Sequence, residues 1–502
     1  MTLAEPAPSA DASPPAAPAL NKGLALLVLA VAQLMVVLDA TIVNVALPDI
    51  ARALEVRSNA DLQWVVTGYT LTFGGFLLLG GKLADRVGRK EVFIGGAVLF
   101  AVASLVGGLA GNLGVLLGAR AVQGVGGALM SPAALSLIAV IFQEGKERNR
   151  ALGIYAAITA GGAAVGLILG GVLTEYASWR WVFFVNLPIA GVAVLGAVAV
   201  LPHSRDEDAQ GFDVAGAVLV TGGLMALVYG LVKGNDHGWG SGQTVGVLAL
   251  AGVLLAAFVV VQLRARSPLV PFRIFRNRSV LGADLGSLLV GAGIFAIFFF
   301  LILWMQVVNG YSPVRSGLAF LPMTVLIGVS AGIGSQLLGR IGPRPLLVVG
   351  PLLAGLGLVV LGLRLEPGSD YLTVVLPALA LVALGMGTTF VALTSSAVAG
   401  VAPEDAGIAS ALLNAGQQVG GALGLAVLTA VSTARTDALV PGGQPTDPAA
   451  LPAYVGALVD GWSLGFLVGG GLLLLAAVVM GSLVSVSKEE AVQALKDAPV
   501  AA

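Results

Sequence analysis

The 502-residue chain has no cysteine and little charge. Without cysteine, disulfides, thiolate metal sites and thiol catalysis are excluded. Only 11% of its residues are charged, against about 25% in soluble domains. A net charge of −1 argues against a nucleic-acid partner. With 57% hydrophobic residues and a mean hydropathy of +0.96, the composition indicates an integral membrane protein in a lipid bilayer.

Histidine is also nearly absent. His203 and His237 both lie between apolar runs, so we interpret them as loop residues and expect no metal or other cofactor. Residues 1–22 are rich in Ala, Pro and Ser and are expected to form a disordered tail. They do not resemble a signal peptide, because the first apolar run is long enough to span and only Lys22 gives it a basic flank.

Long apolar runs dominate the remaining sequence and predict an all-α fold with fourteen membrane-spanning helices. The expected spans are 24–47, 62–81, 92–111, 113–141, 150–174, 181–201, 212–232, 243–263, 280–304, 316–338, 345–363, 371–398, 405–431 and 462–486. Basic residues are distributed unequally around them. Of 26, 18 fall on the side of the termini, 7 on the opposite side and Arg120 within a span. The asymmetry predicts cytoplasmic termini in a cell membrane.

An internal repeat divides the chain. Residues 83–90 align with 337–344 at an offset of 254, and glycines of the fifth and thirteenth spans align at the same offset. Helices 1–6 therefore correspond to helices 9–14, which is a transporter architecture. The expected segments are a tail at 1–22, six-helix halves at 23–202 and 267–487, an inserted helix pair at 203–266, and a cytoplasmic tail at 488–502.

Asp39 is the only charged residue from Gly23 to Pro48. It lies about 22 Å along a helix from Leu24, inside the hydrocarbon, where an acid costs about 2.5–3.5 kcal/mol and is rarely idle. Arg120 lies about 10 Å into the fourth span, at nearly the same depth. The two should pair or share a polar cavity. Opposing effects of charge and burial would let Asp39 exchange a proton; the alternative is a static ion pair.

Two further patterns indicate helix packing. In the turn between the second and third spans, basic residues alone would account for the positive charge expected of a cytoplasmic loop, so Asp85 needs another explanation. Its carboxylate could bind a helix N-terminus or an arginine of a neighbouring segment and so act as a latch. The turn residues of interest are Gly81, Asp85, Arg86, Gly88, Arg89 and Lys90. Small-residue stripes allow helices to approach closely, and we expect these stripes at the seam between the two halves. The alternative is that they form a dimer face, although we expect the chain to be a monomer. These glycines are Gly162, Gly166, Gly170, Gly416, Gly420 and Gly424.

Several polar and aromatic residues in the spans could line a substrate cavity. They are Gln33, Asn44, Gln123, Tyr155, Thr159, Phe295, Phe299, Trp304, Asn414, Gln417 and Gln418. Asp284 is the only acid within a span of the second half. Its place near the start of the ninth span suggests a position at the membrane interface.

These motifs resemble the major facilitator superfamily. The 81–90 turn is similar to its helix 2–3 loop motif, and the run Arg120 to Gly127 to its helix 4 motif. The runs Leu38 to Pro48 and Gly162 to Gly171 resemble motifs of the fourteen-helix drug/proton antiporters. The family usually has proline where this chain has Leu167.

The resemblance implies alternating access between two halves and outward transport of lipophilic drugs or antibiotics against inward proton flow. It assigns Asp39 as the proton and cation site and Arg120 as its partner. Asp85 and Arg89 would belong to a cytoplasmic gate that meets helix 13 near Pro403-Glu404-Asp405. An exporter or flippase of one native metabolite or lipid is the alternative. An enzyme is disfavoured, because no paired base, metal ligands or activated nucleophile is evident.

Overall fold

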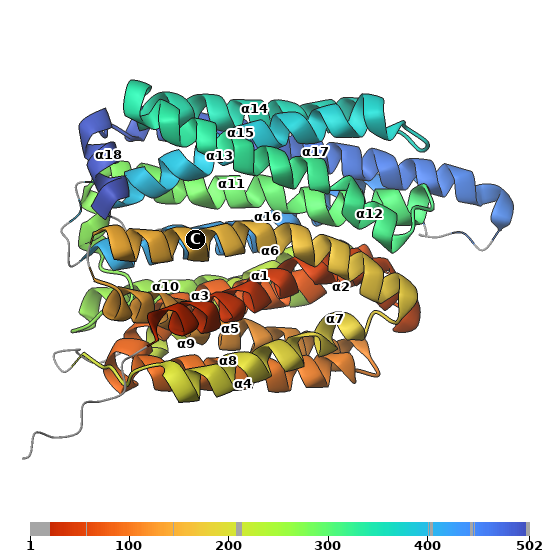
Figure 1. The fold of residues 1–502 in the computed structure, drawn as a ribbon. Helices are drawn as coiled ribbons and strands as arrows, with labels where there is room; N and C mark the ends of the chain where they lie inside the picture. The colour runs from red at the N-terminus through yellow and green to blue at the C-terminus, as the bar shows by residue number, and fades with distance from the viewer. Residues whose placement is uncertain are drawn as a thin grey trace, which may run out of the picture.

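The computed structural model describes residues 21–56, 58–143, 145–206, 213–399, 401, 405–441, 445 and 447–497. Within these ranges fourteen helices are long and apolar enough to cross a membrane, which confirms the predicted count. Figure 1 shows them side by side. We call the side on which α1 begins and α17 ends the terminal side, and the other the opposite side.

Several spans consist of two consecutive helical segments. The first half contains α1 (Lys22–Ala53), α2 (Asn59–Leu62), α3 (Trp64–Val87), α4 (Arg89–Gly108), α5 (Leu113–Ile141), α6 (Lys146–Tyr176), α7 (Trp181–Phe184) and α8 (Asn186–Val200). It is followed by α9 (Val214–His237), α10 (Gly242–Arg264) and η1 (Phe272–Arg276). The second half contains α11 (Arg278–Leu303), η2 (Trp304–Val308), α12 (Pro313–Ala319), α13 (Leu321–Ile341), α14 (Pro343–Arg364), η3 (Tyr371–Val375), α15 (Leu376–Val398), α16 (Ala406–Leu439), η5 (Pro448–Ala450), α17 (Leu451–Leu483) and α18 (Lys488–Asp497).

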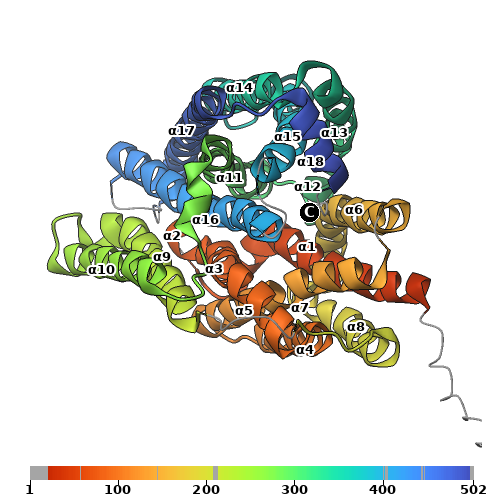
Figure 2. The same ribbon diagram turned by 90° about the vertical axis from the view of Figure 1, so that its left-hand side faces the viewer.

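The helices form two groups with an additional pair at one edge. Figure 2, viewed along the helices, shows the first half below, the second half above, and α6 and α16 between them. The pair α9 and α10 lies beside α3 and α16. Helix α18 lies on the terminal side against α13 and α15.

Helix ends follow local sequence signals. Between α4 and α5, the Asn112 side chain accepts a hydrogen bond from the Val115 amide at 2.9 Å, which caps an exposed helix start. Gly88 joins α3 to α4 with φ of 136°, a conformation that glycine adopts readily. The last span begins before residue 462, where the sequence predicted its start. Asp460 does not end the helix, because its carboxylate pairs with Arg435 at 2.6 Å.

The two halves pack against each other most extensively along two seams. On the opposite side α6 packs against α12, where a Cβ on Gly317 would lie 2.3 Å from the Leu167 carbonyl oxygen. Nearby, Gln306 Nε2 donates to the Val45 carbonyl at 3.0 Å. Along the second seam α3 packs against α16, and a Cβ on Gly74 would lie 3.0 Å from the Gln418 Cβ. The α6–α12 contact therefore holds the two halves together on the opposite side.

Candidate functional site: a buried ion pair in the first half

The centre of the site is an ion pair between α1 and α5. The Arg120 guanidinium donates to Asp39 Oδ2, and the two side chains are 1% and 0% exposed. Arg120 Nε also donates to the Val65 carbonyl at 2.8 Å, and its guanidinium lies 4.4 Å from the centre of the Tyr69 ring. The planar guanidinium suits this combination of directed donors and ring stacking. Arg120 is thereby held in one orientation.

Two amide side chains complete the surroundings of the carboxylate. Gln123 Nε2 donates to Asp39 Oδ1 at 3.0 Å, and Asn186 Nδ2 donates to the same oxygen at 2.8 Å. Gln123 lies one turn after Arg120, so both face α1. Both amides also donate to Ser104 Oγ, at 2.8 and 3.4 Å. The ionised carboxylate thus has three donors, which offsets much of the cost of burying it.

The site unites five helices, although sequence reasoning found only part of it. Asp39, Arg120 and Gln123 were singled out, whereas Tyr69, Ser104 and Asn186 were missed. All are buried, with at most 2% exposed. Each missed residue is polar within an otherwise apolar span. That signal does not identify a site by itself, because many polar residues in spans only form hydrogen bonds with the backbone of their own helix.

A second polar cluster connects α1, α5 and α6. Gln33 Oε1 accepts hydrogen bonds from Ser131 Oγ at 2.9 Å and from Tyr155 Oη at 2.7 Å. Thr159 and Asn44 donate only to carbonyls one turn earlier in their own helices. Gln33 and Tyr155 therefore belong to an ordered internal contact between helices.

The aromatic candidates of the second half differ in how deeply they are buried. Phe299 and Trp304 are 1% and 0% exposed and belong to a core that includes Phe300 and Trp462. Both side chains are covered in this arrangement, and their contact with substrate stays a prediction. Phe295 is half-buried and meets Gly421 of α16.

The polar candidates of the second half lie on α16. Asn414 Nδ2 donates to the Ser410 carbonyl at 3.1 Å. Gln417 and Gln418 are both half-buried, and the Cβ of Gln418 faces α3 across the seam between the halves. These two amides thus remain candidates for contact with substrate.

Within the turn between α3 and α4, Asp85 pairs with Arg89. Arg89 Nε and Nη2 donate to the same Asp85 oxygen at 3.0 and 2.8 Å. Lys90 is buried and donates to the Val198 and Leu201 carbonyls at the end of α8. Arg86 is exposed, Gly81 is half-buried, and Gly88 makes the turn.

The expected meeting place of this turn with helix 13 is only partly described. Pro403 and Glu404 lie outside the described residues. Asp405 pairs with Arg273 of η1 at 2.8 Å. The Asp85 side chain accepts from Arg89 of its own turn, while its carbonyl accepts from the Asp206 amide after α8 at 2.8 Å.

The helices that carry the glycine stripes lie at the seam, since α6 packs against α12 and α16 against α3, but the stripes themselves face a helix of their own half. Cβ atoms on Gly162, Gly166 and Gly170 would lie within 2.0–2.9 Å of α1 atoms. On α16, Gly420 and Gly424 meet the α11 backbone at 2.0 and 2.2 Å, and Gly416 lies 3.5 Å from the Asp284 carbonyl oxygen. Both stripes are covered by a helix of their own half.

Asp284 is not an interfacial acid with its carboxylate in water. Both of its carboxylate oxygens are buried, and neither has a hydrogen-bond partner within the described part of the chain. The residue follows the start of α11 by only six positions, but α16 packs over it at Gly416. Closeness to a helix end therefore did not predict exposure.

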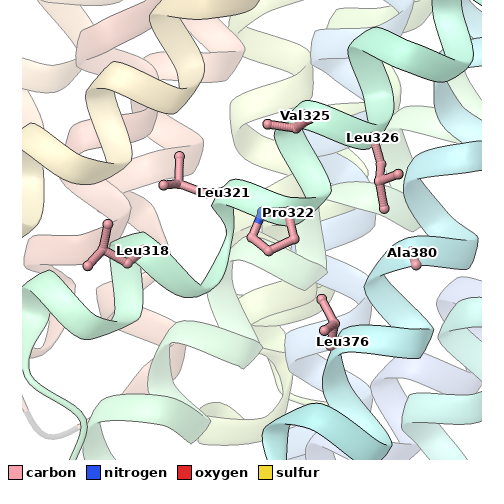
Figure 3. A pocket seen from close by; sticks show the side chains of 7 residues that line it. All are labelled: Leu318, Leu321, Pro322, Val325, Leu326, Leu376 and Ala380. Atoms are coloured by element: carbon pink, nitrogen blue, oxygen red, sulfur yellow. The ribbon is translucent and has the colours of Figure 1, made fainter.

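An open apolar groove lies apart from these polar groups, between α12, α13 and α15 (Figure 3). It is lined by Leu318, Leu321, Pro322, Val325, Leu326, Leu376 and Ala380. Since no lining residue is titratable, the groove cannot exchange a proton. The first-half ion pair and the groove are separate features.

Fourteen spans in two related halves, with an ion pair buried in one of them, define a membrane transporter of alternating-access type. The Major Facilitator Superfamily profile matches residues 29–425. The puromycin resistance protein pur8 of Streptomyces alboniger is 44% identical over 469 residues, covering 93% of this chain and 92% of that protein. The cephamycin export protein CmcT of Amycolatopsis lactamdurans is 41% identical over 443 residues, covering 87% and 89%.

A further relative and a solved structure agree. The tetracenomycin C resistance and export protein of Streptomyces glaucescens is 35% identical over 488 residues and covers 90% of each chain. A bacterial homologue of the human lysosomal transporter Spinster, solved in an inward-facing conformation, has a TM-score of 0.65 at 19% identity, covering 93% of this chain and 98% of that one. The chain belongs to the Major Facilitator Superfamily.

Proposed function

We propose that this transporter exports lipophilic drugs or antibiotics in exchange for protons. The observation that carries the proposal is the Asp39–Arg120 pair, a completely buried acid held by three donors in a membrane-spanning half. Relatives that match almost the whole chain are resistance and export proteins for puromycin, cephamycin and tetracenomycin C. Those compounds are the first substrates to test.

In this mechanism Asp39 alternates between two states. Ionised, it accepts from Arg120, Gln123 and Asn186, and the network is satisfied. A proton on Asp39 removes its charge, so Arg120 becomes a buried cation without a counterion, which is unfavourable by several kcal/mol. Rearrangement of α1 against α5 relieves that cost. Proton binding would thus bias the arrangement of the halves.

The orientation follows from the charge asymmetry between the two sides. We take the terminal side as cytoplasmic and the protein as resident in the cell membrane. We also take the first half to end at residue 202, the inserted helix pair at residue 266 and the second half at residue 487. The α6–α12 contact would then close the external side. Because each glycine stripe is covered by a helix of its own half, we take the working unit to be a monomer. We take the chain not to be an enzyme, because its family and its relatives are transporters.

The decisive experiment uses purified protein in proteoliposomes with an imposed pH gradient. Uptake of puromycin driven by the gradient is expected for the natural chain and absent for Asp39→Asn. In a susceptible host lacking its own pumps, only the natural chain should raise resistance. Equal uptake with and without the gradient would refute proton coupling. Uptake restricted to one lipid or metabolite would favour the alternative of a dedicated exporter or flippase.

A further inference from the structure

Asp284 combines burial with a lack of partners. Its two carboxylate oxygens are buried and accept no hydrogen bond within the described residues. Asp39, in contrast, accepts from three donors. An ionised carboxylate without donors in an apolar site costs several kcal/mol. The surroundings of Asp284 therefore suit a carboxyl that carries a proton until a cation reaches it.

The position of Asp284 is fixed by close helix packing. Gly416 of α16 allows the two backbones to approach, since its Cβ would lie 3.5 Å from the Asp284 carbonyl oxygen. One turn later, Ser287 Oγ donates to the Leu413 carbonyl at 2.8 Å. Helix α16 in turn packs against α3 through Gly74 and Gln418. Asp284 thus lies beside the helix that joins the two halves.

Within the described part of the chain, no charged side chain forms an ion pair or hydrogen bond with the Asp284 carboxylate. The charged residues of α11 and of the elements packed against it are Arg278 of α11 itself, Arg273 and Arg276 of η1, Asp405 before α16, Arg435 and Asp437 near the far end of α16, Asp460 within α17, and Lys22, Asp39, Asp49 and Arg52 of α1. Helix α15 carries no charged residue. Arg273 is already paired with Asp405, and Arg435 with Asp460.

We propose that Asp284 is a second proton-exchange site, which takes the cationic group of a lipophilic substrate. The inference rests on the proposed export function and deepens it. When the cation arrives from the cytoplasm, the carboxyl O–H bond breaks, the proton leaves to the cytoplasm and an ion pair forms; no other bond changes. On the external side a proton returns to the carboxylate and the cation departs.

This proposal changes the charge balance of transport. If Asp39 alone exchanged a proton, one proton would enter for each monocation exported and no net charge would move. With Asp284 as well, two protons enter for each monocation, and one positive charge moves inward. A dication exchanged for two protons would move no charge. The proton-to-substrate ratio therefore separates the two cases.

The test measures that ratio with tetraphenylphosphonium, a permanent lipophilic monocation, in proteoliposomes. The membrane potential and pH gradient at which net flux stops give the number of protons exchanged. The natural chain is expected to exchange two protons, and Asp284→Asn to transport with one. Ser287→Ala, one turn away on the same face, is the packing control and should keep two. A ratio of one in the natural chain, or an unchanged ratio in Asp284→Asn, overturns the proposal.

A second measurement covers variants that do not transport. Infrared difference spectra of the natural chain should show a protonated-carboxyl band that decreases when tetraphenylphosphonium is added, and this change should be absent in Asp284→Asn. A change that persists in the variant overturns the proposal. Failure of pH-driven transport of both puromycin and tetraphenylphosphonium by the natural chain would instead refute the export function, while the infrared band would still decide the role of Asp284.

Discussion

Arg120 and Asp39 form an ion pair that the surrounding helices cover, because the two side chains are 1% and 0% exposed. Removing one member of a buried pair costs about 3–5 kcal/mol, since the other is left charged and uncompensated. In the proposed mechanism, protonation of Asp39 would likewise leave Arg120 charged and without a counterion. The pair is therefore suited to couple proton binding to a change in packing.

Asp39→Asn should abolish transport driven by a pH gradient while the protein still inserts. The amide has nearly the same size but cannot exchange a proton. Gradient-driven uptake into proteoliposomes checks this, with yield and thermal unfolding as measures of integrity. Asp49→Asn is the matched control on the same helix, because Asp49 pairs with Arg52 near the opposite end. Full gradient-driven uptake by Asp39→Asn would show that the coupling acid lies elsewhere.

Gln123→Leu should reduce transport about tenfold or more. The substitution removes a donor to Asp39 and the link to Ser104, and hydrogen bonds to charged groups contribute about 1.5–3 kcal/mol. Initial uptake rates measure the effect. Thr70→Val is a suitable control, because its hydroxyl donates only to the Val66 carbonyl one turn earlier. Rates within twofold of the natural chain would mean that Gln123 does not support the carboxylate.

Much of this site could be predicted from sequence, because the depth of a residue in the membrane follows from how many residues separate it from the end of its helix. Asp39 and Arg120 were expected at one level, and the fold brings them into contact. Asn186 was not expected, since its contact depends on the packing of α8 against α1 and α4. The fourteen spans were predicted for a similar reason: hydropathy is local.

The direction in which a helix face points was harder to predict. Gly166 and Gly420 signal a close approach, but the sequence does not say to which helix, and each one packs inside its own half. Asp284 shows the same limitation. Its distance from the helix start suggested water, whereas α16 covers it at Gly416. Tertiary neighbours decide both cases.

Gly317→Ala should shift the protein away from the state closed on the opposite side. A Cβ there would lie 2.3 Å from the Leu167 carbonyl oxygen, so α6 and α12 must separate. The cysteine-free chain allows spin labels at exposed Tyr176 and Leu372, and their distance distribution should shift to longer values.

The control for this shift is Gly328→Ala on α13, where a Cβ meets nothing within 4 Å. The distance distribution for that variant should match the natural chain. If Gly317→Ala also matched it, the α6–α12 contact would not determine closure on this side.

The last prediction concerns α18, which begins with a reciprocal cap. Glu490 Oε2 accepts from the Ser487 amide at 2.9 Å, and Ser487 Oγ accepts from the Glu490 amide at 3.2 Å. The amide and hydroxyl of Ser487 hold the pKa of Glu490 below its ordinary value. Because that pKa is lower when α18 is folded, the cap stabilises the helix at neutral pH and is lost as the pH falls through the depressed pKa.

Glu490→Gln and Ser487→Ala should therefore speed amide hydrogen exchange across residues 488–497 at neutral pH. Glu490→Gln should also remove the difference between neutral and acidic buffer. Glu489→Gln is the control, because Glu489 faces Lys488 at 3.5 Å and takes no part in the cap. Since Ala491 is fully buried where α18 meets α13 and α15, loss of the cap should also loosen α18 from the terminal-side ends of these helices. Exchange in Glu490→Gln that still depends on acidification would assign the pH response to another group.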